Sequence, residues 1–102
     1  MDIVKYLKVQ MEWSQKVFGK GKRTGGIIEH ITKELDEIKA DPDDLEEWID
    51  IIILGLDGFW RHGGLPQDLM PMLLFKQGKN LVRRWPLPLS EDKATEHLRD
   101  EE

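Results

Sequence analysis

Two pairs of acidic residues with the same spacing are the part of this sequence best suited to chemistry. Glu34 and Glu37 form one Glu-x-x-acid pair, and Glu47 and Asp50 form the other. On a helix, residues three apart lie next to each other, so each pair presents two carboxylates on one face. Clustered carboxylates with too few cations nearby favour hard divalent ions, Mg²⁺ or Mn²⁺. The pattern favours a metal site, with a solvated acidic surface as the alternative.

The residues around the first pair predict a helix. Apolar side chains recur at helical spacing over residues 27–38 and define one face. Since successive residues are about 100° apart on a helix, Glu34 and Glu37 lie on one flank of that face, with His30 between them. This helix therefore places two carboxylates and an imidazole on the same side.

The second pair is predicted to lie in a buried helix. Residues 41–44, DPDD, are typical of a helix start, with a capping Asp and Pro in the first turn. The residues that follow leave almost no polar face, which is typical of a buried central helix. An ionised Glu47 or Asp50 would be costly there unless it were paired or bound to metal. Arg61 is placed to pair with Asp57, which leaves the four acids without partners.

The segment 19–26, GKGKRTGG, separates the first acidic helix from the helix before it. Its glycines and its cations, which include Lys22 and Arg23, could hold phosphate groups. The spacing of a P-loop is absent. A mobile linker with solvated lysines is an equally good interpretation of this pattern.

An amphipathic helix is predicted from Ile3 to Phe18, and Gly19 is expected to end it. Trp13 and Phe18 are expected in the core of the domain. The alternative is that one of the two aromatic side chains contacts a nucleobase.

A fourth helix is expected to open at Pro66, with Pro71 either in its first turn or at a kink. Lys76, Asn80 and Arg83 repeat along one stripe of this helix. They suit phosphate and sugar or base contacts, or else form a solvated stripe. The expected core face consists of Leu69, Met72, Leu73, Phe75 and Val82.

The end of the chain, residues 85–102, is predicted to be an extended connector followed by a short charged helix capped by Ser90. The 102 residues are enough for one domain, 1–102. We expect that domain to be all-α, because the sequence has no strand alternation. A chain this small with four tryptophans has more apolar surface than one thin bundle can hide, so we expect an oligomer.

Composition excludes several classes of function. The net charge of −5 argues against a nucleic-acid surface, and the absence of cysteine excludes disulfides and thiolate chemistry. The longest apolar run is too short to span a membrane, and the N-terminus has no signal-peptide pattern. A cytoplasmic location is the expectation that remains.

Taken together, the motifs resemble those of the MazG-like all-α nucleoside triphosphate pyrophosphohydrolases. The two acidic pairs are similar to the ExxE…ExxD signature of that family. The similarity is greater to its phage-associated dATP/dGTP diphosphohydrolase-type branch, and it covers nearly the whole chain with the motifs in order. The matching segments are Phe18-Gly19, Arg23 to Ile27, His30 to Ile38, Pro42 to Asp50, Leu54 to Arg61, Lys76 to Pro86 and Glu96 to Arg99.

This resemblance implies a fold and an activity. The fold would be a helical bundle of four main helices completed in a homodimer or homotetramer. The activity would be Mg²⁺-dependent hydrolysis of a nucleoside triphosphate, expected to be a purine deoxynucleotide, to monophosphate and pyrophosphate. A phage-encoded member would act in the host cytoplasm.

The resemblance also assigns roles to individual residues. Glu34, Glu37, Glu47 and Asp50 would be catalytic ligands for two or more Mg²⁺ ions, with Mn²⁺ as an alternative metal, and Glu37 could also orient the attacking water. The expected substrate contacts are Lys76, Asn80, Arg83, Lys22, Arg23, His30 and Trp13.

Two other classes of function fit the same residues. One is a non-catalytic dimerisation or adaptor module in which the acidic cluster is structural. The other is a nucleotide sensor that binds metal without turnover. A rise in thermal stability on adding metal would argue against the first, because ligands that bind only the folded state stabilise it.

Overall fold

A computed structural model describes residues 1–87 and 90–99. The chain divides into two compact units, Met1–Leu69 and Met70–Glu102, and each is described by itself. The regular structure in the described residues is helical, apart from one isolated β-bridge. This confirms the all-α class. The expectation of a single functional domain stays a prediction, and so does completion of the bundle by oligomerisation.

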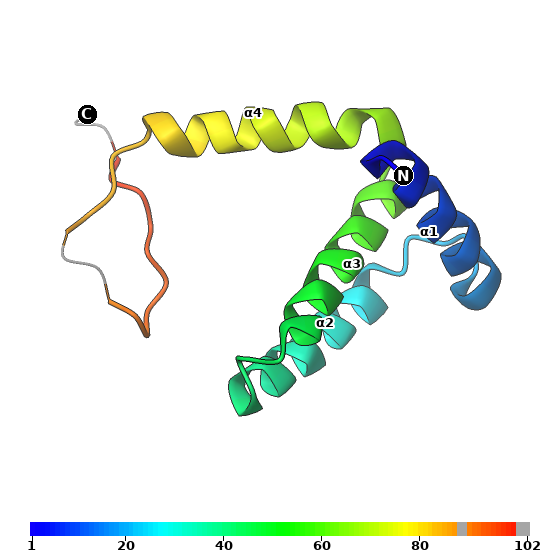
Figure 1. Ribbon diagram of the computed structural model, residues 1–102, viewed down its shortest axis with the longest axis horizontal. Coiled ribbons are helices and arrows are strands. Elements are labelled where there is room, and N and C mark those ends of the chain that lie inside the picture. Colours follow the sequence, from blue (N-terminus) through cyan, green and yellow to red (C-terminus); the bar gives the residue numbers. More distant parts are fainter. Residues whose placement is uncertain (88–89, 100–102) are drawn as a thin grey trace. The chain divides into compact units, whose positions relative to one another are not determined.

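The first unit contains three α-helices: α1 (Ile3–Phe18), α2 (Thr24–Ala40) and α3 (Leu45–Arg61). Helices α2 and α3 form an antiparallel hairpin, drawn from cyan to green in Figure 1, and they pack along each other. Helix α1 packs against α3 and against a short 3₁₀-helix, η1 (Pro66–Asp68). The hairpin is the element that carries both acidic pairs.

The helix ends follow the local sequence. Asp2 caps α1 by accepting a hydrogen bond from the Lys5 amide at 2.9 Å, and Gly19 ends it with a φ of 86°. Asp44 caps α3 by accepting from the Glu46 amide at 3.1 Å. An Asp does cap α3, but it is Asp44, which follows Pro42, whereas Asp41, which precedes Pro42, lies at the C-terminal end of α2. Pro42, however, lies in the turn before α3, not in its first turn, because α3 begins only at Leu45.

The C-terminus of α3 closes in a Schellman arrangement. The Gly64 amide donates to the Phe59 carbonyl at 2.9 Å, and the Gly63 amide donates to the Trp60 carbonyl at 3.2 Å. Gly63 has a φ of 105°, which favours glycine. At Gly64, a Cβ would lie 2.4 Å from the Phe59 ring, so no side chain fits there without a rearrangement. Glycine therefore ends this helix.

The core of the first unit is small and partly polar. Its buried apolar residues are Leu7, Ile27, Ile38 and Trp60. The prediction that α3 is buried all round is wrong for the single chain, because Trp48, Ile49 and Ile52 are about half exposed. Within the first unit, α1 and α2 are the α-helices that pack along α3, and they leave one of its apolar faces uncovered.

Helix α4 (Leu69–Val82) belongs to the second unit, except for its first residue. Pro71 lies in its first turn. Pro66 opens η1 and not α4 itself. The expected core face of α4 is not formed, since α4 has no buried residue. The predicted short C-terminal helix is also wrong for residues 90–99, which contain bends and one bridging residue, Leu98, paired with Arg84. Pro88 and Leu89 of the predicted connector lie outside the described residues.

Across residues 1–87 and 90–99, none of the helices combines the length and apolar character needed to cross a lipid bilayer.

Candidate metal and nucleotide site

Three of the four predicted carboxylates lie together between α2 and α3. One oxygen each of Glu34, Glu37 and Glu47 lies within 4.8 Å of the other two. Glu34 is buried, Glu47 is partly buried and Glu37 is exposed. The cluster therefore opens to solvent on the Glu37 side, as a site that exchanges ligands must.

Two oxygens in this cluster have no hydrogen-bond partner. Oε2 of Glu34 and Oε2 of Glu47 are both buried and both unpaired. A buried carboxylate oxygen without a donor is costly, because it has lost water and gained nothing in return. A divalent cation with oxygen ligands supplies the missing partner, so these residues fit a hard metal ion such as Mg²⁺ or Mn²⁺.

The electrostatics of the cluster point the same way. When Glu47 carries a proton, a hydrogen bond to Glu37, loss of hydration and a hydrogen bond to Glu34 favour that form, and they raise the pKa of Glu47 to about 7 from its ordinary 4.5. The negative charges of Glu37 and Glu34 add to this shift. In the absence of metal, the cluster therefore holds a proton near neutral pH, which a cation would displace.

This shift predicts how metal-free stability depends on pH. The folded protein keeps the Glu47 proton up to a pKa of about 7, whereas the unfolded chain releases it near 4.5. The folded state binds more protons between these values, so the free energy of unfolding should fall as pH rises from 4.5 to 7. Urea unfolding in chelator, compared with Glu47→Gln, measures this contribution. A difference between the two proteins that does not change with pH would contradict it.

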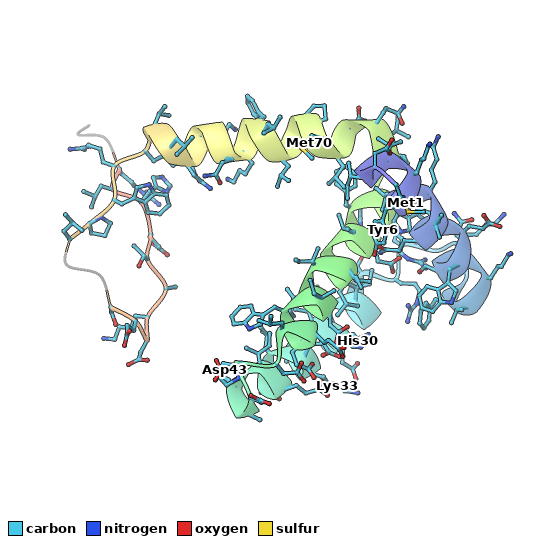
Figure 2. All side chains as sticks on the ribbon, viewed as in Figure 1. Met1, Tyr6, His30, Lys33, Asp43 and Met70 are labelled. Carbon is cyan, nitrogen blue, oxygen red and sulfur yellow. The ribbon has the colours of Figure 1, made fainter. Side chains whose placement is uncertain are left out.

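His30 fixes the orientation of Glu34. Its Nε2 lies 3.1 Å from Oε1 of Glu34, one helical turn further along α2. One oxygen of Glu34 is thereby engaged, and the unpaired Oε2 is the one left for a ligand. Figure 2 labels His30 on this part of α2. His30 thus lies beside the acidic cluster with its side chain about half exposed, and its role in substrate binding stays a prediction.

Asp50 lies outside the group of three carboxylates. It instead lines a neighbouring cavity of about 330 Å³, whose wall Glu34 and His30 also form. That volume lies within the range of small-molecule sites. The cavity therefore begins at the acidic cluster and extends between α1, α2 and α3.

The far wall of this cavity is aromatic. Trp13 and Phe18 both line it, with their rings edge to face at a centroid distance of 5.9 Å. The expectation that they are core residues is wrong, because their exposed fractions are 56% and 44%. Both lie in the C-terminal half of α1. They are accessible for stacking, which is the alternative left open by the sequence.

Arg23 lines the cavity and, unlike the titratable His30, carries its positive charge at all pH values used. Its guanidinium lies over the Phe18 ring, 4.6 Å from the centroid. Its Nη2 comes within 3.1 Å of where a Cβ on Gly26 would be, so glycine at this position leaves room for the guanidinium. Lys22 is exposed in the preceding loop and is not part of this wall.

Asp57 belongs to a buried network and not to the acidic cluster. Its Oδ2 accepts from Arg61 Nε at 2.9 Å, and its Oδ1 accepts from Trp60 Nε1 at 2.9 Å. The predicted pairing of Arg61 with Asp57 is confirmed. Because both oxygens of Asp57 are engaged, this carboxylate stabilises the fold at the end of α3.

The remaining predicted contacts lie in the second unit. Lys76 is exposed on α4, and Arg83 Nη1 donates to Asn80 Oδ1 at 3.1 Å. Trp85 Nε1 donates to the Asn80 carbonyl at 3.0 Å. Asn80 and Arg83 thus form a local pair, and their role toward the acidic cluster stays a prediction.

Comparison with known families supplies the context for this geometry. The family model for the dATP/dGTP pyrophosphohydrolases matches residues 6–102. The chain belongs to the dATP/dGTP pyrophosphohydrolase family. Comparisons with curated proteins and with solved structures gave no match. The match to the dATP/dGTP pyrophosphohydrolase model spans both acidic pairs, the loop and α4, and it confirms the resemblance carried by the sequence motifs.

The sequence interpretation missed Gln10. Its Nε2 donates to the Ile53 carbonyl at 2.9 Å and ties α1 to α3, while its buried Oε1 has no partner. Gln10 lines the cavity of this dATP/dGTP pyrophosphohydrolase family member. A signal was present, because Gln10 and Ser14 follow Leu7 on one face of α1, and polar residues on a buried face need partners.

Proposed function

We propose that this protein hydrolyses a purine deoxynucleoside triphosphate to the monophosphate and pyrophosphate in a Mg²⁺-dependent reaction. The observation that carries the proposal is the pair of unpaired, buried oxygens of Glu34 and Glu47, together with the ligand-sized cavity that Glu34 also lines. Membership of the dATP/dGTP pyrophosphohydrolase family supports the choice of substrate.

The residues divide into two groups along the cavity. Glu34, Glu37 and Glu47 would hold the metal, and Asp50, which lies one turn after Glu47 on α3, would complete its ligands. When bound, a divalent cation polarises phosphoryl oxygens, lowers the pKa of water and neutralises the leaving pyrophosphate. Glu37 is solvent-exposed, which suits a carboxylate that orients an incoming water molecule.

The other end of the cavity would take the nucleoside. The exposed Trp13 ring offers a stacking surface for a purine, and the Arg23 guanidinium offers donors to phosphate oxygens. Lys22, in the same loop, would add positive charge near the phosphates. His30 holds Glu34 in place through its 3.1 Å contact.

The decisive experiment is a chromatographic screen of the common ribo- and deoxynucleoside triphosphates with Mg²⁺ or Mn²⁺. The expected products are a monophosphate and pyrophosphate, released fastest from dATP or dGTP. Tight nucleotide binding without product would support a sensor instead. No rise in melting temperature with either metal would support the adaptor module.

We further propose that the active protein is a homodimer or homotetramer. The support is the uncovered apolar surface of the hairpin, on which Trp48, Ile49 and Ile52 of α3 and Ile28 and Leu35 of α2 are each at least 46% exposed. Burying a side chain of this size contributes about 1.5–3 kcal/mol, so a monomer would forgo much stability.

Light scattering should therefore give at least twice the chain mass of 11.9 kDa. Ile52→Lys should shift the protein toward the monomer, because a charge would replace a buried side chain at the interface. Asp36→Lys, on the exposed side of α2, is the control and should leave the assembly intact. A monomeric wild-type protein with full activity would exclude this proposal.

For α4, we propose that Lys76, Asn80 and Arg83 contact the substrate. Lys76→Ala should raise KM and leave the melting temperature nearly unchanged, because an exposed cation contributes little to folding. Lys93→Ala, which removes an exposed cation outside the motif stripe, is the matched control. Steady-state kinetics that do not change in Lys76→Ala would show that α4 has been misassigned.

A further inference from the structure

One side chain of α3 holds the loop between α1 and α2. The Nη1 of Arg61 donates to the Gly19 carbonyl at 2.8 Å and to the Gly21 carbonyl at 2.6 Å. Both carbonyls belong to the segment that leads into α2. Arg61 is about 40 residues away in sequence from the loop it holds.

The other donors of Arg61 are also engaged. Nε donates to Asp57 Oδ2 at 2.9 Å, and Nη2 donates to the Ser14 hydroxyl at 2.9 Å and to the Ser14 carbonyl at 3.3 Å. A guanidinium has five N–H groups, and five acceptors surround this one. Its side chain is fully buried, so water does not compete for these bonds. Lysine, with three donors on one nitrogen, could not reach all of these acceptors.

Only Lys22 separates Gly21, held by Arg61, from Arg23 in the cavity wall. Arg23 has a φ of 50° and a ψ of 29°, the left-handed conformation that residues with a Cβ avoid. Such a conformation persists only where the surrounding structure imposes it. The bonds from Arg61 to Gly19 and Gly21 hold the chain just before Arg23, and a 2.6 Å contact between Thr24 Oγ1 and His62 Nε2 holds it just after.

We propose that Arg61 is a positioning residue for substrate binding. By holding the carbonyls of Gly19 and Gly21, it keeps the Arg23 guanidinium over Phe18 in the cavity, where it meets the triphosphate. This inference rests on the proposed function, since it needs a polyanionic substrate in the cavity. Arg61 itself touches no substrate, because its side chain is buried behind Ser14 and Asp57.

The test compares Arg61→Lys, Arg23→Ala and the double variant with the wild-type protein. The probe is the α,β-methylene analogue of dATP, titrated with Mg²⁺, so that binding is measured without turnover. Arg61→Lys should weaken binding about tenfold, the loss expected for one charged hydrogen bond. In the Arg23→Ala background it should cause no further loss, because Arg61 acts through Arg23.

Trp60→Phe is the matched control. It removes the Trp60 bond to Asp57 Oδ1, keeps an aromatic ring under the Arg61 guanidinium, which lies 4.5 Å from the Trp60 ring centroid, and leaves every bond from Arg61 to the loop. Melting temperatures should fall in both Arg61→Lys and Trp60→Phe. Only Arg61→Lys should weaken analogue binding, so general destabilisation is separated from the loss of loop position.

Limited digestion with trypsin reports on the loop independently of any substrate. Trypsin cleaves after Lys20, Lys22 and Arg23, all of which are exposed. Cleavage there should be several times faster in Arg61→Lys than in Trp60→Phe under the same folded conditions. Ser14→Ala removes a single acceptor of Arg61 and should also make cleavage faster. It serves as the test if Arg61→Lys does not fold.

The outcomes separate the two proposals. Unchanged analogue affinity in Arg61→Lys, equal effects in Trp60→Phe, or additive losses in the double variant would each overturn the positioning role. A wild-type protein that binds the analogue but releases no pyrophosphate from dATP or dGTP would overturn the proposed reaction alone. A wild-type protein that does not bind the analogue would overturn the positioning role.

Discussion

Replacing Glu47 with Gln is expected to lower kcat by about 10³-fold, because a metal ion supplies several kcal/mol of transition-state stabilisation and the variant loses a ligand for it. The same change should raise the metal-free melting temperature near pH 7, since it removes a carboxylate whose pKa is raised to about 7 by its acidic neighbours. The rise in melting temperature on adding Mg²⁺ should shrink. Opposite effects on activity and on metal-free stability are the mark of a metal ligand.

Glu46→Gln is the matched control for this variant. Glu46 is the neighbouring residue on α3, its side chain is exposed, and it lies outside the acidic cluster. It should leave kcat and the Mg²⁺ response unchanged. Asp50→Asn extends the experiment to the carboxylate outside the cluster, and a Mg²⁺ response equal to that of the wild type would remove Asp50 from the ligand set. Near-normal pyrophosphate release by Glu47→Gln would exclude the metal site itself.

Asp57→Ala is expected to be the most damaging single change to the fold. It leaves the fully buried Arg61 without its carboxylate partner and Trp60 Nε1 without its acceptor. Removing one member of a buried ion pair costs about 3–5 kcal/mol, because the remaining charge stays in a poorly solvating environment. Small domains have total stabilities of about 5–15 kcal/mol, so much of the variant should be unfolded on mild warming.

Urea unfolding followed by tryptophan fluorescence measures this loss. Asp36→Ala, which removes an equal charge from the exposed side of α2, is the control and should change the free energy of unfolding by less than about 0.5 kcal/mol. A similarly small loss in Asp57→Ala would mean that Arg61 finds another partner and that the network contributes little.

The helices could be predicted because their signals are local. The periodicity of the apolar residues and the glycines at 19 and 63–64 specify α1 and α3 within a few residues. Local signals could not predict how much of the apolar surface of α3 and α4 is buried within one chain. An apolar helix face indicates that something covers it, but it does not say whether the same chain or another chain does so.

The acidic site was predictable for a related reason. The spacing within each pair places its carboxylates on one helix face, and the short turn brings the two helices together. The cavity beside it could not be predicted. It depends on the distance between α1 and the hairpin, which is set by contacts such as Gln10 to Ile53 and Arg61 to Ser14, more than 40 residues apart in sequence.

The short turn between α2 and α3 also has a consequence for the order in which the chain folds. Helices joined by residues 41–44 meet by closing a small loop, and such contacts form faster than those between distant segments. We therefore expect Glu34, Glu37 and Glu47 to come together early, and the bonds from Arg61 to Ser14, which span 47 residues, to form late. Because the three carboxylates repel one another, we expect protons or divalent cations to speed this early step.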